Sequence, residues 1–470
     1  MRMGPHMMMP GDADAVKGRK IDRTSMSRVW VFASPYKTAI IGFLLSIIFA
    51  SAVGLVPPFV FRAIIDDAIP SGNRGRIWFL AMLAVGAALF DAFLAITQRW
   101  YSARIGEGLI YDLRVALFDK VQRMPVAFFT RTQTGSLISR LNNDVVGAQS
   151  AVTSTLGSVV SNVVVLVMTL GAMFTLEWRL TLLSLVVLPI FVIPAKRVGQ
   201  RLQIIAREQM DLNAQMNTQM NERFNVSGAL LVKLFGRHQG EVNAFSGRAA
   251  RVRDIGILSA LYGRVFFVAL GLVGALGAVA IYGIGAFMVV SGGITIGTLV
   301  AMATFVQRIY QPLTGLTNAR LEVMTALVSF ERVFEVLDAP VAITDRPRAI
   351  DIVKPLGNIE FDHVAFRYPP GASVSIASLE LAGVMQGSDP DTDVLVDVSL
   401  RVDAGSTVAI VGTSGAGKTT LAMLIARMYD VTSGVVRLDG NDVRDLTGVS
   451  LRAAIGVVSQ DPHMFHETIK

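Results

Sequence analysis

A glycine-rich run toward the carboxyl end of the sequence contains the residue types that can hold phosphate. It has the spacing Gly-x-x-x-x-Gly-Lys-Thr and comprises Gly412, Thr413, Ser414, Gly415, Ala416, Gly417, Lys418, Thr419 and the adjoining Thr420. Glycines let backbone N–H groups curl around phosphate oxygens, and the start of a following helix adds partial positive charge. Lys418 supplies a point charge for the terminal phosphates, and the Thr419 hydroxyl can ligate Mg²⁺. The run predicts a site for ATP and Mg²⁺.

The segments on either side of this run fit the same interpretation. Residues 407–411 have the apolar composition of a strand, and residues 418 to about 429 favour a helix. A chance glycine-rich turn is the alternative, but such a turn needs neither a strand before it nor a helix after it. With a further strand predicted at 359–366, this part of the chain is expected to be an α/β domain.

The composition of the whole chain indicates a membrane protein with a soluble part attached. Of its 470 residues, 52% are hydrophobic and 17% are charged, and the mean hydropathy is +0.52. Soluble domains carry about 25% charged residues. The composition excludes a disordered chain and a collagen-like repeat. Since the sequence has no cysteine, disulfides, thiolate metal sites and a cysteine nucleophile are excluded as well.

Long stretches almost free of charge predict six membrane-spanning helices, each needing about 20 apolar residues. The stretches are 38–61, 77–98, 156–176, 180–195 and the two halves of 265–307, which divides at a turn over 291–293. The first begins too late, and is too long, for a cleaved signal peptide. The sequence therefore predicts a multi-pass protein of the cell (cytoplasmic) membrane.

The distribution of Lys and Arg predicts the orientation of these spans. The loops between spans two and three, and between spans four and five, are rich in Lys and Arg, whereas the alternate loops are poor in them. By the positive-inside rule both long loops and both termini lie in the cytoplasm. The Lys and Arg residues of the cytoplasmic loops then account for the net charge of +7, and a nucleic-acid partner is not expected. We predict that the spans continue as helices into both loops, with turn-rich tips near 130–143 and 235–240.

The chain thus divides into four predicted parts. They are a cytoplasmic tail (1–37), a six-helix transmembrane domain (38–320), a linker (321–356) that begins with a helix over 321–338, and a soluble α/β domain (357–470). An insertion rich in Gly, Ser and Asp interrupts the soluble domain at 371–393.

Several further motifs resemble one known family. In the soluble part they are Phe366-Arg367-Tyr368-Pro369, the glycine-rich run, Leu438-Asp439-Gly440 and Val457-Val458-Ser459-Gln460-Asp461-Pro462. In the first long loop they are Phe128-Phe129, Thr134-Gly135, Arg140 and Asp144; in the second, Val232-Lys233-Leu234-Phe235 and Glu241; and in the linker, residues 332–338. Together with six spans, these motifs are similar to those of ABC exporter half-transporters, in which a permease and an ATPase share one chain.

The resemblance implies roles for single residues and for partners. Tyr368 would stack on adenine, the alternative being an ordinary half-buried strand tyrosine. Gln460 would reach Mg²⁺ and the attacking water, the alternative being a surface glutamine. The resemblance also implies a second half-transporter as partner, in a homodimer or a heterodimer, surrounding membrane lipid, and a transported substrate that the sequence does not identify.

The sequence departs from the family pattern after Gln460. The family's Leu-Ser-Gly-Gly-Gln signature, the second Asp that holds Mg²⁺, the catalytic Glu and the switch His do not occur before Lys470, so the chain is expected to be a fragment or a reading frame cut short. Two functions follow from this. The first is an ATP-driven exporter half that works as a dimer. The second is a subunit that binds ATP without hydrolysing it, regulatory or inactive without a complete partner.

Two charged residues fall inside predicted spans, where ionisable groups are costly and often functional. Asp91 either reaches interfacial water or an arginine such as Arg99, or lies in the substrate path. Arg308 either extends toward water or contacts substrate.

Overall fold

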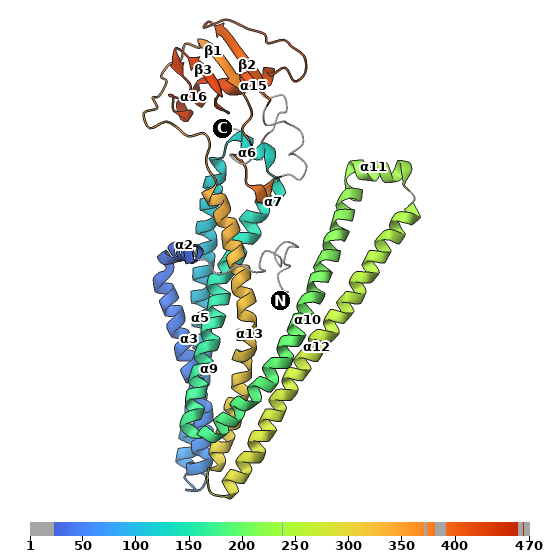
Figure 1. The fold of residues 1–470 in the computed structure, drawn as a ribbon. Helices are drawn as coiled ribbons and strands as arrows, with labels where there is room; N and C mark the ends of the chain where they lie inside the picture. Colours follow the sequence, from blue (N-terminus) through green and yellow to red (C-terminus); the bar gives the residue numbers. More distant parts are fainter. Residues whose placement is uncertain (1–22, 237, 371–373, 381–391, 459–463, 465–470) are drawn as a thin grey trace. The chain divides into compact units, whose positions relative to one another are not determined.

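The computed structural model describes residues 23–470 except 237, 371–373, 381–391, 459–463 and 465–470 (Figure 1). The chain divides into two compact units. Unit 1 consists of Met1–Tyr111 and Val146–Phe330, and unit 2 of Asp112–Val145 and Glu331–Lys470.

Unit 1 is built from helices. They are α2 (Arg23–Ala33), η1 (Ser34–Tyr36), α3 (Lys37–Val53), α4 (Val56–Ala63), η2 (Ile64–Ala68), α5 (Arg74–Gln122), α8 (Val145–Ser150), η4 (Ala151–Thr155), α9 (Leu156–Leu176), α10 (Trp178–Phe224), α11 (Val226–Phe235), α12 (His238–Val290) and α13 (Ile296–Asp338). α5 and α13 continue into unit 2. α3 packs along α9, and α10 packs along α12 with α11 joining their ends (Figure 1).

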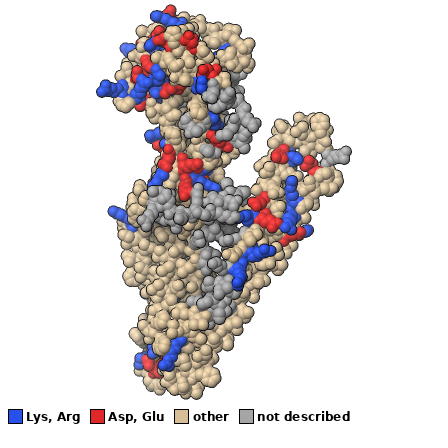
Figure 2. Space-filling model, viewed as in Figure 1, with Lys and Arg blue, Asp and Glu red and all other residues tan. Residues whose placement is uncertain are grey.

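Four helical stretches in the described part of the chain are long and apolar enough to cross a membrane. They are Ser27–Ala68, Arg74–Gln122, Thr134–Leu176 and His238–Val290, and they contain the first, second, third and fifth predicted spans. The predicted fourth and sixth spans lie in α10 and α13, which are helical, and the count of six stays a prediction. In Figure 2 a broad surface of these helices carries no charged side chain. The turn over 291–293 is confirmed, with Gly292 at a φ of +74°.

The spans continue as long helices, as expected, but the first loop tip differs from the prediction. α5, α10 and α12 run for 49, 47 and 53 residues. The first tip is not turn-rich, since α6 (Val126–Arg131), α7 (Thr134–Ser139) and the π-helical turn η3 (Arg140–Asp144) form it. At the second tip the helical chain is interrupted within the predicted 235–240, where α11 ends at Phe235 and Gly236 is extended. Asn225 shows why such a short helix can begin, since its side chain accepts a hydrogen bond from the Gly228 N–H at 2.7 Å.

Unit 2 contains a four-stranded antiparallel sheet in the order β2-β1-β3-β4. The strands are β1 (Ile359–Phe366), β2 (Leu395–Val402), β3 (Ser433–Leu438) and β4 (Asn441–Asp442). Unit 2 also contains η5 (Ala377–Leu379), α15 (Lys418–Ile425) and α16 (Gly448–Ala454). β1 is the strand predicted at 359–366. Its buried Phe361 and Phe366 pack in one apolar cluster with Leu421 and Leu424 of α15, and this cluster fixes the helix against the sheet.

Two secondary-structure predictions near the glycine-rich run are wrong. Residues 407–411 form no strand, and Val408 and Val411 are 48% and 91% exposed. A strand of such apolar composition is stable when strands flank it and both faces are covered, and none of the described strands pairs with it. The helix ends at Ile425 rather than near 429, because Arg427 adopts a left-handed φ of +50° that a helix does not continue through.

One carboxylate joins the linker to the sheet. Asp439, in the turn after β3, accepts hydrogen bonds from the backbone N–H groups of Leu356 (2.7 Å), Gly357 (3.0 Å) and Asn358 (2.8 Å). Burial acts to raise the pKa of Asp439, but these hydrogen bonds outweigh it and the pKa lies below its ordinary value. The carboxylate therefore stabilises the junction fully above the ordinary carboxyl pKa, and this stabilisation is lost as the pH falls through the lowered pKa of the folded state.

We expect Asp439→Ala to speed chymotryptic cleavage after the exposed Leu356 by about tenfold at neutral pH. Three backbone donors lose their acceptor, which favours local opening of the linker, and proteolysis follows the population of opened states. The control is Asp403→Ala, which removes an exposed carboxylate that pairs with the exposed Arg401. Equal cleavage rates in the two variants would contradict the role of Asp439.

Candidate nucleotide-binding site

The glycine-rich run forms a loop that leads directly into α15. Gly415 and Gly417 have φ angles of +85° and +82°, which residues with a side chain rarely adopt. A Cβ at Gly417 would also come within 2.7 Å of the Leu395 side chain. Gly417 is the N-cap of α15, so the backbone N–H groups at the start of the helix face the loop. The sequence prediction of a loop followed by a helix is confirmed in this local geometry.

Lys418, the first residue of α15, folds back over the loop. Its ammonium donates to the carbonyl oxygens of Gly412 at 3.0 Å and Thr413 at 2.7 Å. The loop carbonyls are exposed, so a phosphate oxygen can compete with them for the ammonium. Thr419 is exposed and its hydroxyl is accessible for a metal ion, whereas Thr420 is 4% exposed, on the buried face of α15.

Tyr368 lies beside the same helix. Its hydroxyl is 3.0 Å from the Thr420 hydroxyl, and its ring makes edge-to-face contacts with Phe366 and Tyr429 at centroid distances of 5.0 and 5.3 Å. Burial raises the pKa of Tyr429 in this cluster. The structure thus brings Tyr368 to the glycine-rich loop, with its ring packed among aromatic side chains. A cavity of about 350 Å³ adjoins Tyr368 and Tyr429.

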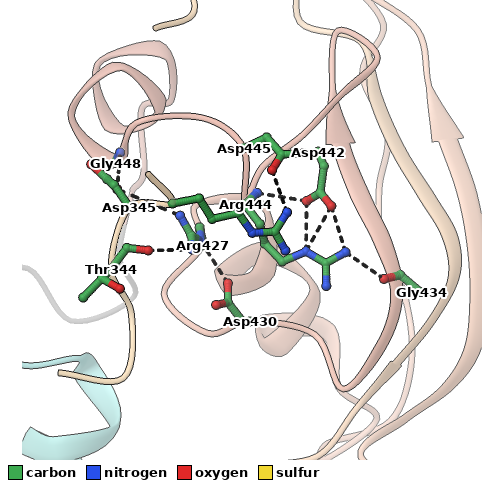
Figure 3. A network of polar contacts seen from close by, with 10 residues as sticks. Thr344, Asp345, Arg427, Asp430, Gly434, Asp442, Arg444, Asp445 and Gly448 are labelled. Atoms are coloured by element: carbon green, nitrogen blue, oxygen red, sulfur yellow. Dashed lines mark hydrogen bonds and ion pairs between the residues drawn. The ribbon is translucent and has the colours of Figure 1, made fainter. Parts of the chain in front are cut away.

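The far end of α15 is anchored by a buried arginine that the sequence analysis missed. Arg427 is 7% exposed and donates to the Asp430 carboxylate at 2.9 Å and to the Thr344 carbonyl of the linker at 3.1 Å (Figure 3). Next to it, Arg444 holds the Asp442 carboxylate with hydrogen bonds of 2.8–3.1 Å. These pairs tie the linker and the turns around β3 to the helix that carries Lys418. The spacing of Arg427 and Asp430 was a sequence signal for one of these pairs.

The remaining predicted residues are placed as follows. Gln460 lies outside the described residues. Within the described part of the chain, no group of three or more His, Asp or Glu side chains forms a metal centre, so Mg²⁺ would depend on the Thr419 hydroxyl and on the phosphates of the nucleotide, a donor set that this ion commonly uses.

The two charged residues of the predicted spans lie in unit 1. Arg308 of α13 is half-buried and donates to the Gly54 carbonyl, at the break between α3 and α4. Asp91 of α5 is exposed and interacts electrostatically with Arg308. Arg308 is therefore a charged neighbour of Asp91, and a role of either residue in the substrate path stays a prediction.

Comparison with known families accounts for both parts of this chain. Residues 40–313 match the family model described as the ABC transporter transmembrane region, and residues 395–470 match the one described as ABC transporter. The chain belongs to the ABC transporter family. It is accordingly a multi-pass membrane protein with a helical membrane domain, followed by part of an α/β ATP-binding domain, and the resemblance inferred from its motifs is confirmed.

Curated relatives align with almost the whole chain. A Bacillus subtilis protein named putative multidrug export ATP-binding/permease protein YgaD is 31% identical over 95% of this chain and 74% of its own length. An ATP-dependent lipid A-core flippase of Syntrophus aciditrophicus is 27% identical over 94% of this chain and 70% of its own length. A putative multidrug export ATP-binding/permease protein of Staphylococcus aureus is 29% identical over 95% and 75%. This chain is thus similar to permeases fused to an ATP-binding domain.

The contacts of Tyr368 predict opposite behaviour for two substitutions. Tyr368→Ala should weaken ATP binding by about 1–3 kcal/mol, the contribution of a base stacked on an aromatic ring. Tyr368→Phe keeps the ring and removes only the hydrogen bond to Thr420, so its affinity should stay within about threefold of the parent. Equilibrium titration with a fluorescent ATP analogue measures both. Equal losses in Phe and Ala would show that the hydroxyl matters rather than the ring.

Proposed function

We propose that this chain is one half of an ATP-driven exporter, in which ATP binding and hydrolysis at the assembled transporter move a substrate out of the cytoplasm. The observation that carries the proposal is the glycine-rich loop capping α15, with Lys418 in place to receive phosphate, on the same chain as a helical membrane domain. The names of the relatives, multidrug export and lipid A-core flipping, support export as the direction of transport.

In this proposal each residue of the loop has a defined task. Backbone N–H groups of residues 412–420 surround the phosphates, Lys418 neutralises their charge, and Thr419 holds Mg²⁺ together with Gln460. Tyr368 supplies the stacking surface for adenine. When bound, Mg²⁺ would supply positive charge that offsets the negative charge of the phosphates.

We further propose that the functional unit is a dimer, with a second copy or a related half-transporter. The exposed apolar surface of α11 supports this. Val226, Leu230, Leu231, Leu234 and Phe235 are between 56% and 88% exposed, on a short helix at the end of a long hairpin. Apolar surface gathered in this way is typical of a protein interface, and the ATP-binding domain of a second half is the occupant that we propose.

The proposed function predicts that Lys418→Ala weakens ATP binding by about ten- to a hundredfold. The triphosphate would lose a charge-assisted interaction of about 1.5–3 kcal/mol. Binding is measured on the full chain in lipid nanodiscs by titration with a fluorescent ATP analogue. Lys354→Ala is the matched control, since it removes an exposed lysine of the linker. ATP binding that is unchanged in Lys418→Ala would refute the site.

The proposed orientation can be tested by cysteine labelling, because the chain has no cysteine of its own. Three exposed serines and one exposed threonine allow small substitutions on both predicted sides. A membrane-impermeant maleimide added to intact cells should label Ser71→Cys and Ser291→Cys. It should label Thr134→Cys and Ser227→Cys only after permeabilisation, since their loops are rich in Lys and Arg. The opposite pattern would invert the topology.

A further inference from the structure

The insertion at 371–393 separates Tyr368 from β2, and part of it packs into unit 2. Within the described residues 374–380, the side chains of Val374, Ile376 and Leu379 are 6%, 6% and 2% exposed. We call residues 374–380 the strap. An insertion that served only as a surface loop would not bury three of the six side chains that the structure describes in this segment, so the strap needs a structural explanation.

The backbone of the strap pairs with the first cytoplasmic loop. The Gln133 N–H donates to the Leu379 carbonyl at 3.0 Å, and Thr132 and Glu380 form an antiparallel β-bridge. Thr132 is 5% exposed while Gln133 is exposed, so the two neighbouring side chains point in different directions. The strap therefore docks on the segment between α6 and α7.

A buried guanidinium reinforces this pairing. Arg140, 5% exposed, donates to the Ser378 hydroxyl at 2.5 Å and to the Glu335 carboxylate at 2.9 Å. The Ser378 hydroxyl in turn donates to Glu335 at 2.8 Å. One cation thus joins the first loop, the end of α13 and the strap. Because a buried charge must keep its partners, displacing Ser378 weakens the whole cluster.

The first loop also contacts the segment that carries Tyr368. Arg131 donates to the Pro369 carbonyl at 3.2 Å, one residue from Tyr368. The first loop therefore contacts this segment at two places. One is Pro369, just before the insertion, and the other is residues 378–380, within it. Tyr368 is held next to the first of these two attachments.

We propose that the strap couples the first cytoplasmic loop to the nucleotide site, so that strap docking and ATP binding stabilise each other. The proposal rests on the ATP site put forward above. A docked strap keeps the loop, and through Arg131 the Tyr368 segment, in the arrangement that receives the nucleotide. Since coupling between two binding equilibria is reciprocal, bound ATP must then favour the docked strap by the same factor.

Disulfide trapping tests the docking and its response to ATP. Residues opposite each other in an antiparallel bridge have Cα atoms about 4.5–5.5 Å apart, a separation that a disulfide can span. Thr132→Cys with Glu380→Cys should crosslink under mild oxidation in the full chain, and ATP should raise the initial rate at least about twofold. The control pair, Gln133→Cys with Glu380→Cys, differs by one position and should crosslink far more slowly. In a Lys418→Ala background, ATP should have no effect on the rate.

Nucleotide affinity tests the other direction of the coupling. Ser378→Ala and Leu379→Ala should each weaken ATP binding about three- to tenfold, although neither residue belongs to the glycine-rich loop. Ser406→Ala, which also removes a hydroxyl bonded to a nearby backbone carbonyl, should leave the affinity unchanged. Ser378→Ala removes a single hydroxyl and is the variant least expected to disturb folding.

The outcomes separate this inference from the proposed function. If the parent chain binds ATP and Lys418→Ala binds it about ten- to a hundredfold more weakly, the proposed site stands. On that basis, equal crosslinking of the two cysteine pairs overturns the docking. The coupling is overturned if ATP does not change the crosslinking rate and the strap variants do not change the affinity for ATP. If the parent chain itself binds no ATP, the proposed function falls and takes the coupling with it, whereas selective crosslinking of the Thr132–Glu380 pair would still establish the docked strap.

Discussion

The guanidinium of Arg140 is the point at which three distant segments of unit 2 meet. Moving an arginine side chain out of water costs on the order of several kcal/mol unless partners compensate it. Here the partners are Glu335 at the end of α13 and Ser378 in the insertion. The apolar packing agrees with this arrangement, since Ala127 of the first loop belongs to the same buried cluster as Phe361 of β1. The segment Asp112–Val145 of the first long loop therefore belongs to unit 2 and contributes to its buried core.

The nucleotide site combines an adaptable end with a rigid one. Lys418 satisfies its charge with two exposed loop carbonyls, which phosphate oxygens can replace with little rearrangement. At the other end of α15, the buried Arg427 donates hydrogen bonds to Asp430 and to a linker carbonyl. Loss of these partners would leave a buried charge uncompensated. The helix is thus fixed where it meets the linker and responsive where it meets the ligand. Such an arrangement suits a site at which ligand binding changes the conformation of other parts of the molecule.

In the membrane domain the governing constraint is that backbone polar groups find no water in hydrocarbon, so each span must be helical. The helices do not stop at the predicted membrane boundary, and α5 and α13 each contribute residues to both compact units. The break between α3 and α4 at Gly54 is the place where a carbonyl becomes available to the Arg308 side chain. A Cβ at Gly54 would meet that guanidinium, which lies at the end of a flexible side chain.

The sequence by itself determined the features that depend on neighbouring residues. Hydropathy located the helices that cross the membrane, the glycine-rich spacing located the loop before α15, and the motifs identified the family. The same local signals failed at residues 407–411, because an apolar strand needs flanking strands that no local pattern supplies. Only the tertiary structure decided that Tyr368 packs beside Thr420, that Arg427 ties α15 to the linker, and that Arg140 pairs with Ser378. These last two residues are 238 positions apart, and their pairing depends on how α5, α13 and the insertion fold together, which no short window of sequence contains.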